Sequence, residues 1–92
     1  MRNLNDDEQQ QLEEWASLYL TVDEIAILLD VNVDELRREF KNSNSNNSKA
    51  YHRGKLQTTL ALRRQTKLFA EKGSPQAEQM MQDFSAKQKL SE

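Results

Sequence analysis

The spacing of apolar residues along the chain predicts five amphipathic helices. The first runs from about Asp6 to Tyr19, preceded by Asn5 as the capping residue, with Glu8 in the position that completes a capping box. Its apolar side chains recur at steps of three and four residues, which predicts one buried stripe: Leu12, Trp15, Ala16 and Tyr19.

Two short helices follow, separated by only the three residues from Asp30 to Asn32. The first of them starts at Thr21, which forms a capping-box pattern with Glu24, and the second runs from Asn32 to about Lys41. A small residue stands where the two helices would cross, with larger apolar residues at the core positions around it: Ala26, then Ile25, Leu29, Val31 and Leu36. This arrangement is typical of a helix-turn-helix.

The second half of the chain is predicted to form a helical arm. Seven small polar residues at 42–48 cannot bury apolar surface, so we expect a flexible hinge there. A long helix should then run from about Ser48 to Lys72, and Gly73 should end it. Pro75 opens a shorter helix that reaches about Lys89 and should fold back on the long one as a hairpin.

The expected fold class is therefore all-α: a three-helix helix-turn-helix head, a long helix and a shorter C-terminal helix. The corresponding domains are a head at 1–41, an Asn/Ser hinge at 42–48 and a helical oligomerisation arm at 49–92.

Composition narrows the possible chemistry. The chain has no cysteine and a single histidine, so neither a disulfide framework nor a Cys- or His-rich metal site is expected. The longest apolar run is five residues, and the N-terminus has no apolar signal region, so we expect a cytoplasmic protein without a membrane partner. Short amphipathic helices offer little concavity. We therefore expect no enzyme activity, no catalytic residues and no cofactor.

The net charge of −2 conceals a strong asymmetry along the chain. Residues 1–41 have a balance of −7, whereas residues 49–72 have a balance of +6. Such a division indicates either a nucleic-acid partner or the docking of one segment on another. The DNA-binding candidates comprise the start and exposed side of the second helix of the motif and the basic face of the long helix: Asn32, Val33, Arg37, Arg38, Lys41, Lys49, Arg53, Arg63, Arg64 and Lys67.

The long helix also has a heptad-like pattern, with Gly54, Thr58 and other small residues near its middle, which predicts self-association. Leu56 and Leu60 lie among the positive charges and should remain exposed on a single chain. The oligomerisation candidates are the apolar residues of this helix: Tyr51, Leu56, Leu60, Ala61, Leu62, Leu68 and Phe69.

The second half also carries short motifs: Ala50-Tyr51-His52-Arg53-Gly54-Lys55, Leu62-Arg63-Arg64 and Ala70-Glu71-Lys72-Gly73. Together with the helix-turn-helix, they resemble the small terminase subunits of bacteriophages over nearly the whole chain. The resemblance implies a non-enzymatic subunit that binds double-stranded DNA, assembles into a homo-oligomeric ring and regulates a large ATPase/nuclease subunit in viral genome packaging. A phage protein of this kind would act in the host cytoplasm.

The sequence is compatible with two alternative functions. The protein could be a dimeric helix-turn-helix transcriptional regulator, or an all-helical interaction module that does not bind DNA and whose acidic head docks on the basic arm of a neighbour. Asp34 and Glu35 open the second helix of the motif, where a DNA reader prefers neutral or basic groups. Oligomeric state separates the first two functions, and DNA binding separates both from the third.

Overall fold

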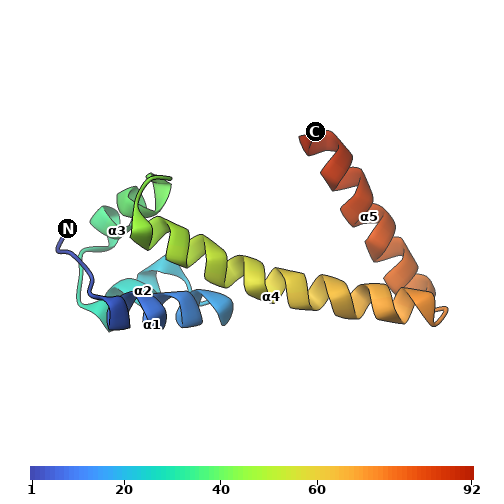
Figure 1. The fold of residues 1–92 in the computed structure, drawn as a ribbon, viewed down its shortest axis with the longest axis horizontal. Helices are drawn as coiled ribbons and strands as arrows, with labels where there is room; N and C mark the ends of the chain where they lie inside the picture. Colours follow the sequence, from blue (N-terminus) through green and yellow to red (C-terminus); the bar gives the residue numbers. More distant parts are fainter. The chain divides into compact units, whose positions relative to one another are not determined.

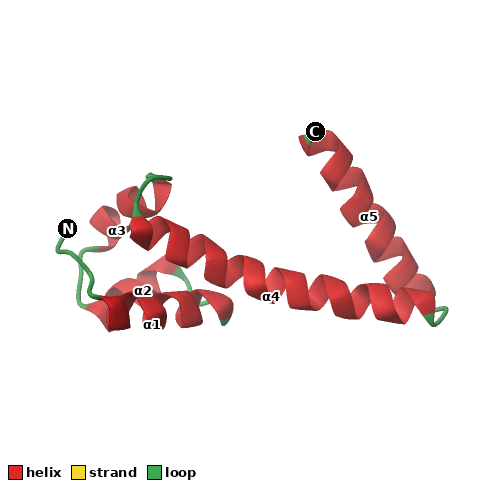
Figure 2. Ribbon diagram, in the orientation of Figure 1, coloured by secondary structure: helices red, strands yellow, loops and turns green.

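A computed structural model describes all 92 residues as helices joined by short connections, with no strands. Figures 1 and 2 show the helices in chain order: α1 (Asp6–Ser17), α2 (Val22–Leu29), α3 (Val33–Lys41), α4 (Asn46–Glu71) and α5 (Pro75–Ser91). The predicted all-α class is confirmed, as is the long helix followed by a shorter one. The chain divides into two compact units, Met1–Thr58 and Thr59–Glu92, so that α4 contributes to both. We call them the head unit and the distal unit.

The starts of the helices follow the predicted capping signals. The side chain of Asn5 accepts a hydrogen bond from the backbone N–H of Glu8 at 2.8 Å, and the carboxylate of Glu8 accepts one in return from the N–H of Asn5. Thr21 and Glu24 form the same reciprocal pair at the start of α2. Ser74 caps α5, and proline occupies the first helical position. These caps satisfy N–H groups that have no partner within the helix.

Three helices end in the same backbone motif. Tyr19, Asp30 and Gly73 have positive φ values of 62°, 56° and 93°, and each follows the end of a helix. After α2, the N–H of Val31 bonds to the carbonyl of Ala26 and that of Asp30 to the carbonyl of Ile27, which is the Schellman arrangement. The prediction for Tyr19 was wrong. Because α1 ends at Ser17 and the chain turns, Tyr19 leaves the buried stripe and is exposed.

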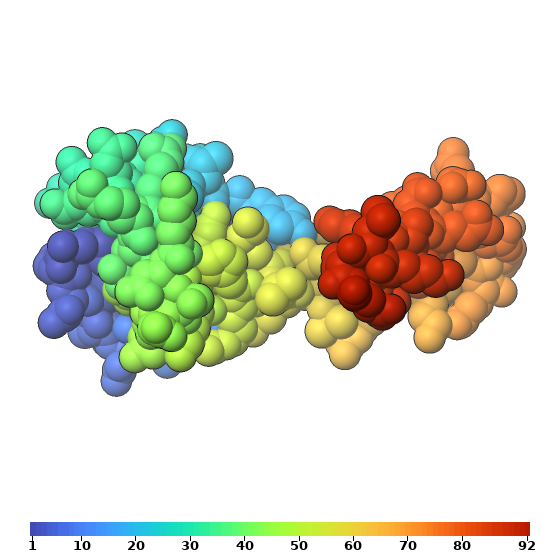
Figure 3. All heavy atoms as spheres, turned by 90° about the horizontal axis from the view of Figure 1, so that it is seen from above, coloured from blue at the N-terminus to red at the C-terminus, as the bar shows by residue number.

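The hydrophobic core of the head unit lies among its helices, which Figure 3 shows as one packed body from blue to yellow-green. The largest side chains without solvent exposure come from three different helices: Leu12, Ile25 and Leu36. Trp15 is partly buried and packs against this core. The apolar positions of α1, α2 and α3 thus converge on a common interior, as a helix-turn-helix head requires.

Residues 42–48 differ from the predicted flexible hinge. Only 42–45 lie outside the helices, because α4 begins at Asn46. The hydroxyl of Ser45 accepts hydrogen bonds from the N–H groups of Asn47 and Ser48, so it caps α4. Asn47 is 8% exposed and Ser48 only 2%. The polar run is therefore a structured connection between α3 and α4.

Buried polar groups at the start of α4 bond to two other helices, α1 and α3. Asn47 accepts a hydrogen bond from the side chain of Gln9 on α1 and donates one to the carboxylate of Glu39 on α3. The hydroxyl of Ser48 donates to the carbonyl of Phe40 at 2.7 Å. No buried side-chain polar atom in the structure lacks a partner. The run lies within the head unit because these bonds offset the cost of burying it.

The first half of α4 also belongs to the head unit, which extends past the predicted boundary at residue 41. Tyr51 was predicted to mediate oligomerisation, but its ring stacks on Phe40 with centroids 4.1 Å apart. Gly54 is buried against α1, and the hydroxyl of Thr58 donates to the carbonyl of Ser17. The seam assigned to self-association therefore packs within the chain as far as Thr58.

The distal unit comprises the rest of α4 and α5. The chain reverses at Gly73, as predicted, but α5 diverges from α4 beyond the turn (Figure 1). The guanidinium of Arg63 lies over the ring of Phe84, 4.5 Å from its centroid. Ala77 is the one buried apolar residue of this unit. The hairpin is therefore open, and most of its apolar side chains face solvent.

Candidate nucleic-acid interface

The two helices predicted to form a helix-turn-helix are α2 and α3, joined by the turn at Asp30–Asn32. The turn is tight because Asp30 adopts the left-handed conformation in which aspartate is better tolerated than most residues. Ala26 is buried, at 3% exposure, as expected for a small residue at the crossing of the two helices. The N-terminus is held to the same place, since Arg2 donates a hydrogen bond to the carbonyl of Leu29 at 2.7 Å.

The first turn of α3, which in many helix-turn-helix proteins contacts bases, is occupied by internal bonds. The side chain of Asn32 accepts hydrogen bonds from the N–H groups of Asp34 and Glu35, at 2.9 and 3.1 Å, and so caps α3. Val33 is half-buried and packs against the core. Two of the predicted DNA-binding residues thus have structural roles.

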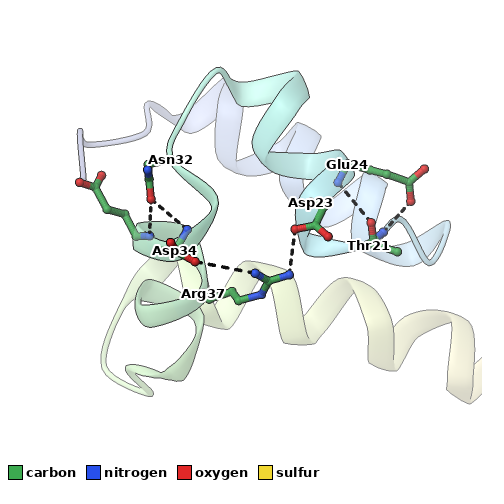
Figure 4. A network of polar contacts seen from close by, with 7 residues as sticks. Thr21, Asp23, Glu24, Asn32, Asp34 and Arg37 are labelled. Atoms are coloured by element: carbon green, nitrogen blue, oxygen red, sulfur yellow. Dashed lines mark hydrogen bonds and ion pairs between the residues drawn. The ribbon is translucent and has the colours of Figure 1, made fainter.

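Arg37 is paired with carboxylates on two helices. Figure 4 shows its guanidinium between Asp23 of α2 and Asp34 of α3, at N–O distances of 2.8 and 3.9 Å. Both pairs are solvent-exposed, so they add little to stability. They still reduce the positive potential that Arg37 presents to a phosphate.

Further negative charge lies close to these groups. Hydrogen bonds from the backbone and hydroxyl of Thr21 lower the pKa of Glu24, so this carboxyl stays ionised at neutral pH (Figure 4). Glu35 lies 3.8 Å from the N-terminal amine. The exposed end of the motif nearest the first turn of α3 is therefore predominantly acidic.

A different part of the head unit gathers basic side chains that have no ionic partner. Lys41, Lys49 and His52 line a shallow hollow together with Phe40, Ser43 and Ser48. Arg38 lies one turn before Lys41 on the same side of α3. The side chains of Arg38, Lys41 and Lys49 are exposed and form neither hydrogen bonds nor ion pairs. We call these residues the α3–α4 basic patch: Arg38, Lys41, Lys49 and His52.

His52 was not among the predicted DNA-binding residues. Its Nδ1 lies 2.8 Å from the carbonyl oxygen of Ser48, one turn earlier in α4, and therefore donates to it as an N–H. His52 follows Lys49 by three residues, which places the two side chains on the same face of the helix. This spacing could have identified His52 as a candidate.

The remaining predicted cations are distributed between the two units. Arg53 of the head unit forms an ion pair with Glu13 of α1 at 3.0 Å. In the distal unit, Arg63 stacks on Phe84, while Arg64 and Lys67 are exposed and form no ion pair. Of the ten DNA-binding candidates, those left free of polar or ring partners are Arg38, Lys41, Lys49, Arg64 and Lys67.

Most of the predicted oligomerisation residues are exposed. Tyr51 belongs to the head core, whereas the others lie on the solvent side of α4. The large ones among them are between 48% and 64% exposed: Leu56, Leu60, Leu62, Leu68 and Phe69. Ala61 is exposed as well. A single chain thus presents apolar surface that is available to a partner.

Comparisons with protein-family models, curated proteins and solved structures give no match to this chain. None of the five helices combines the length and the hydropathy that crossing a membrane requires.

Proposed function

We propose that the protein is a non-enzymatic DNA-binding subunit that acts as an oligomer, in the manner implied by its resemblance to phage small terminases. The observation that carries the proposal is the α3–α4 basic patch, where three unpaired cations lie beside the second helix of a helix-turn-helix. Such groups bind phosphates without a loss of existing ion pairs. The regulation of a large ATPase/nuclease partner is the further role that the resemblance implies.

The geometry favours backbone binding over base reading. Phosphate contacts supply most of the affinity of such proteins and carry no sequence information. Three cations would give a salt dependence with a slope of about −3 in log affinity against log salt. One head is therefore a weak ligand, in the micromolar range or poorer, and an oligomer gains useful affinity by presenting several heads to one duplex.

The test compares two triple variants with the same change in charge. In the first, Arg38, Lys41 and Lys49 are replaced by alanine, and in the second, Lys72, Lys87 and Lys89 are replaced. Binding to a 30-base-pair duplex is measured by filter binding at several salt concentrations. The first variant should weaken binding at low salt by tenfold or more and reduce the slope by about three units. Equal losses in the two variants would contradict the proposal.

One observation favours a second function, an interaction module that does not bind DNA. Arg37, the cation nearest the usual reading position, is paired with Asp23 and Asp34, and the surface around it is acidic. A head of this kind would repel a duplex at the end of the motif that reads bases. Failure of the wild-type protein to bind any duplex at low salt would support this function over the first.

A further inference from the structure

The outer surface of the helix-turn-helix carries a shallow hollow that the proposed function does not use. It is lined by residues of α2, the turn and the start of α3: Asp23, Ala26, Ile27, Asp30, Val31 and Val33. Ile27 is 78% exposed, although it lies in the middle of α2. The hollow therefore has an apolar centre that no part of this chain covers.

The charged residues around this hollow determine which partner surface is electrostatically complementary to it. Asp23 and Asp30 line it, and Asp34 follows Val33 directly. Two cations oppose these three carboxylates: Arg37 pairs with Asp23 and Asp34, and Arg2 interacts electrostatically with Asp30. A phosphate backbone would meet net negative charge here. An apolar surface bordered by basic side chains matches both the centre and the rim, because opposite potentials facing each other favour a specific contact.

The distal unit has a surface of this type. Leu60 is 49% exposed. Arg64 and Lys67 follow it at steps of four and three residues, which places all three on one face of α4. Neither cation has an ionic partner. The distal unit carries six basic and four acidic residues, whereas the head unit carries seven basic and eleven acidic ones.

We propose that the distal unit of one copy docks through Leu60, Arg64 and Lys67 on the Ile27 hollow of a second copy. The inference rests on the self-association included in the proposed function, but not on DNA binding. The contact joins two different surfaces, so it is heterologous, and repetition of it produces a closed ring or an open filament. Each added copy leaves the α3–α4 basic patch of its own head outside the contact.

A charge exchange between two full-length variants tests the contact. The first variant carries Asp23→Lys and Asp34→Lys in the head, and the second carries Arg64→Glu and Lys67→Glu in the distal unit. Sedimentation velocity is measured without DNA at low salt. Each variant alone should be at least tenfold weaker in self-association than the wild type. Their equimolar mixture should recover assembly, because every acidic surface then meets a basic one.

Substitution of Ile27, the apolar residue at the centre of the hollow, provides a second, independent measurement. Ile27→Glu should abolish assembly at concentrations where the wild type associates. Leu18→Glu is the matched control, since Leu18 is also exposed in the head, at 63%, but lies outside the hollow. Circular dichroism verifies that each variant remains helical.

Several outcomes would overturn the inference. If the head variants assemble like the wild type while the distal variant does not, association joins two distal units and only the docking site is wrong. If the mixture of charge variants fails to assemble, the two surfaces do not meet. A wild-type protein that stays monomeric while binding DNA would remove self-association and the inference together, and leave DNA binding standing.

Discussion

The two halves of α4 differ in what they bury, although they belong to one helix. In the head unit, its buried residues are small or polar: Asn47, Ser48, Ala50 and Gly54. In the distal unit, its large apolar residues are 48–51% exposed: Leu60, Leu62, Leu68 and Phe69. Residue type alone would assign the core to the wrong half. What decides burial is whether another helix of the same chain lies close enough.

Close approach explains the small residues of the first half. A Cβ atom built on Gly54 would lie 2.1 Å from the carbonyl oxygen of Glu13 and 2.9 Å from the Cβ of Ala16. The backbone of α1 therefore lies directly against α4 at this point. In the second half Phe84 of α5 packs on Arg63, but the large apolar side chains of α4 stay half-exposed and are left for a partner to cover.

The largest expected effect on stability is that of replacing Gly54. Gly54→Ala forces the backbones of α1 and α4 apart, and we expect a loss of about 2–3 kcal/mol in the free energy of unfolding. The gain in helix propensity, about 1 kcal/mol, offsets only part of the steric cost. Urea denaturation followed by circular dichroism measures the change.

Gly73→Ala is the matched control. At φ 93° alanine is strained, but a Cβ there meets no atom within 4 Å. The expected loss is about 1 kcal/mol and arises from the backbone alone. A Gly54 variant no less stable than this control would mean that α4 does not contact α1 closely.

The next effect concerns the polar connection between α3 and α4. Ser48→Ala leaves the buried carbonyl of Phe40 without its side-chain donor, so we expect a loss of about 1–2 kcal/mol. Ser43→Ala, at an exposed turn position, should change stability by less than about 0.5 kcal/mol. Thermal and urea unfolding of both variants would distinguish a structured connection from a hinge, for which the two substitutions would be equivalent.

A smaller effect is expected in the second half of α4. Leu62→Gln combined with Leu68→Gln should alter the unfolding free energy by less than about 0.5 kcal/mol, because both side chains are already half-exposed. The unfolding free energy is measured by urea denaturation at protein concentrations below those at which the wild type associates. A loss comparable to that of Gly54→Ala would show that these leucines are part of a core within the chain.

The smallest expected effect is the pH dependence of stability, which arises from carboxylates in the caps of the head unit. A hydrogen bond from Arg2 and one from the backbone of Asn5 lower the pKa of Glu8, as the cap of α2 lowers that of Glu24. Both pKa values are lower in the folded state than in the unfolded state. The two ionised carboxylates therefore stabilise the folded state at pH values above the unfolded pKa, about 4.3. This stabilisation is lost as pH falls through the folded pKa.

Glu8→Gln measures this contribution. The variant should show a shallower decline in stability between about pH 5 and pH 3 than the wild type. The same slope in both proteins would mean that the bonds to Arg2 and Asn5 do not favour the charged form of this carboxyl.

Local signals predicted the helix starts, since the caps at Asn5, Thr21 and Ser74 use residues within four positions of each other. Contacts distant in the sequence could not be predicted in this way. The pairing of Arg53 with Glu13 spans 40 residues, and that of Arg37 with Asp23 spans 14. These pairs decide which candidate cations remain free. The basic residues could therefore be identified from the sequence, but their grouping into the α3–α4 basic patch could not.

The Asn/Ser run illustrates the same limit. Small polar residues form a flexible linker when surrounded by solvent, and a buried network when donors and acceptors of other helices surround them. The composition is identical in the two cases. The partners of Asn47, which are Gln9 and Glu39, lie 38 and 8 residues away in the chain, beyond any local pattern.

The position of Trp15 has a practical consequence for spectroscopy. It is the sole tryptophan, and it packs against the head core, while both tyrosines also lie before residue 59. Intrinsic fluorescence therefore reports on the head unit alone, whereas far-ultraviolet ellipticity averages over both units. Melting curves recorded with the two signals coincide only if the units unfold together. Comparison of the two signals thus tests, without an added label, whether the head unit and the distal unit unfold cooperatively.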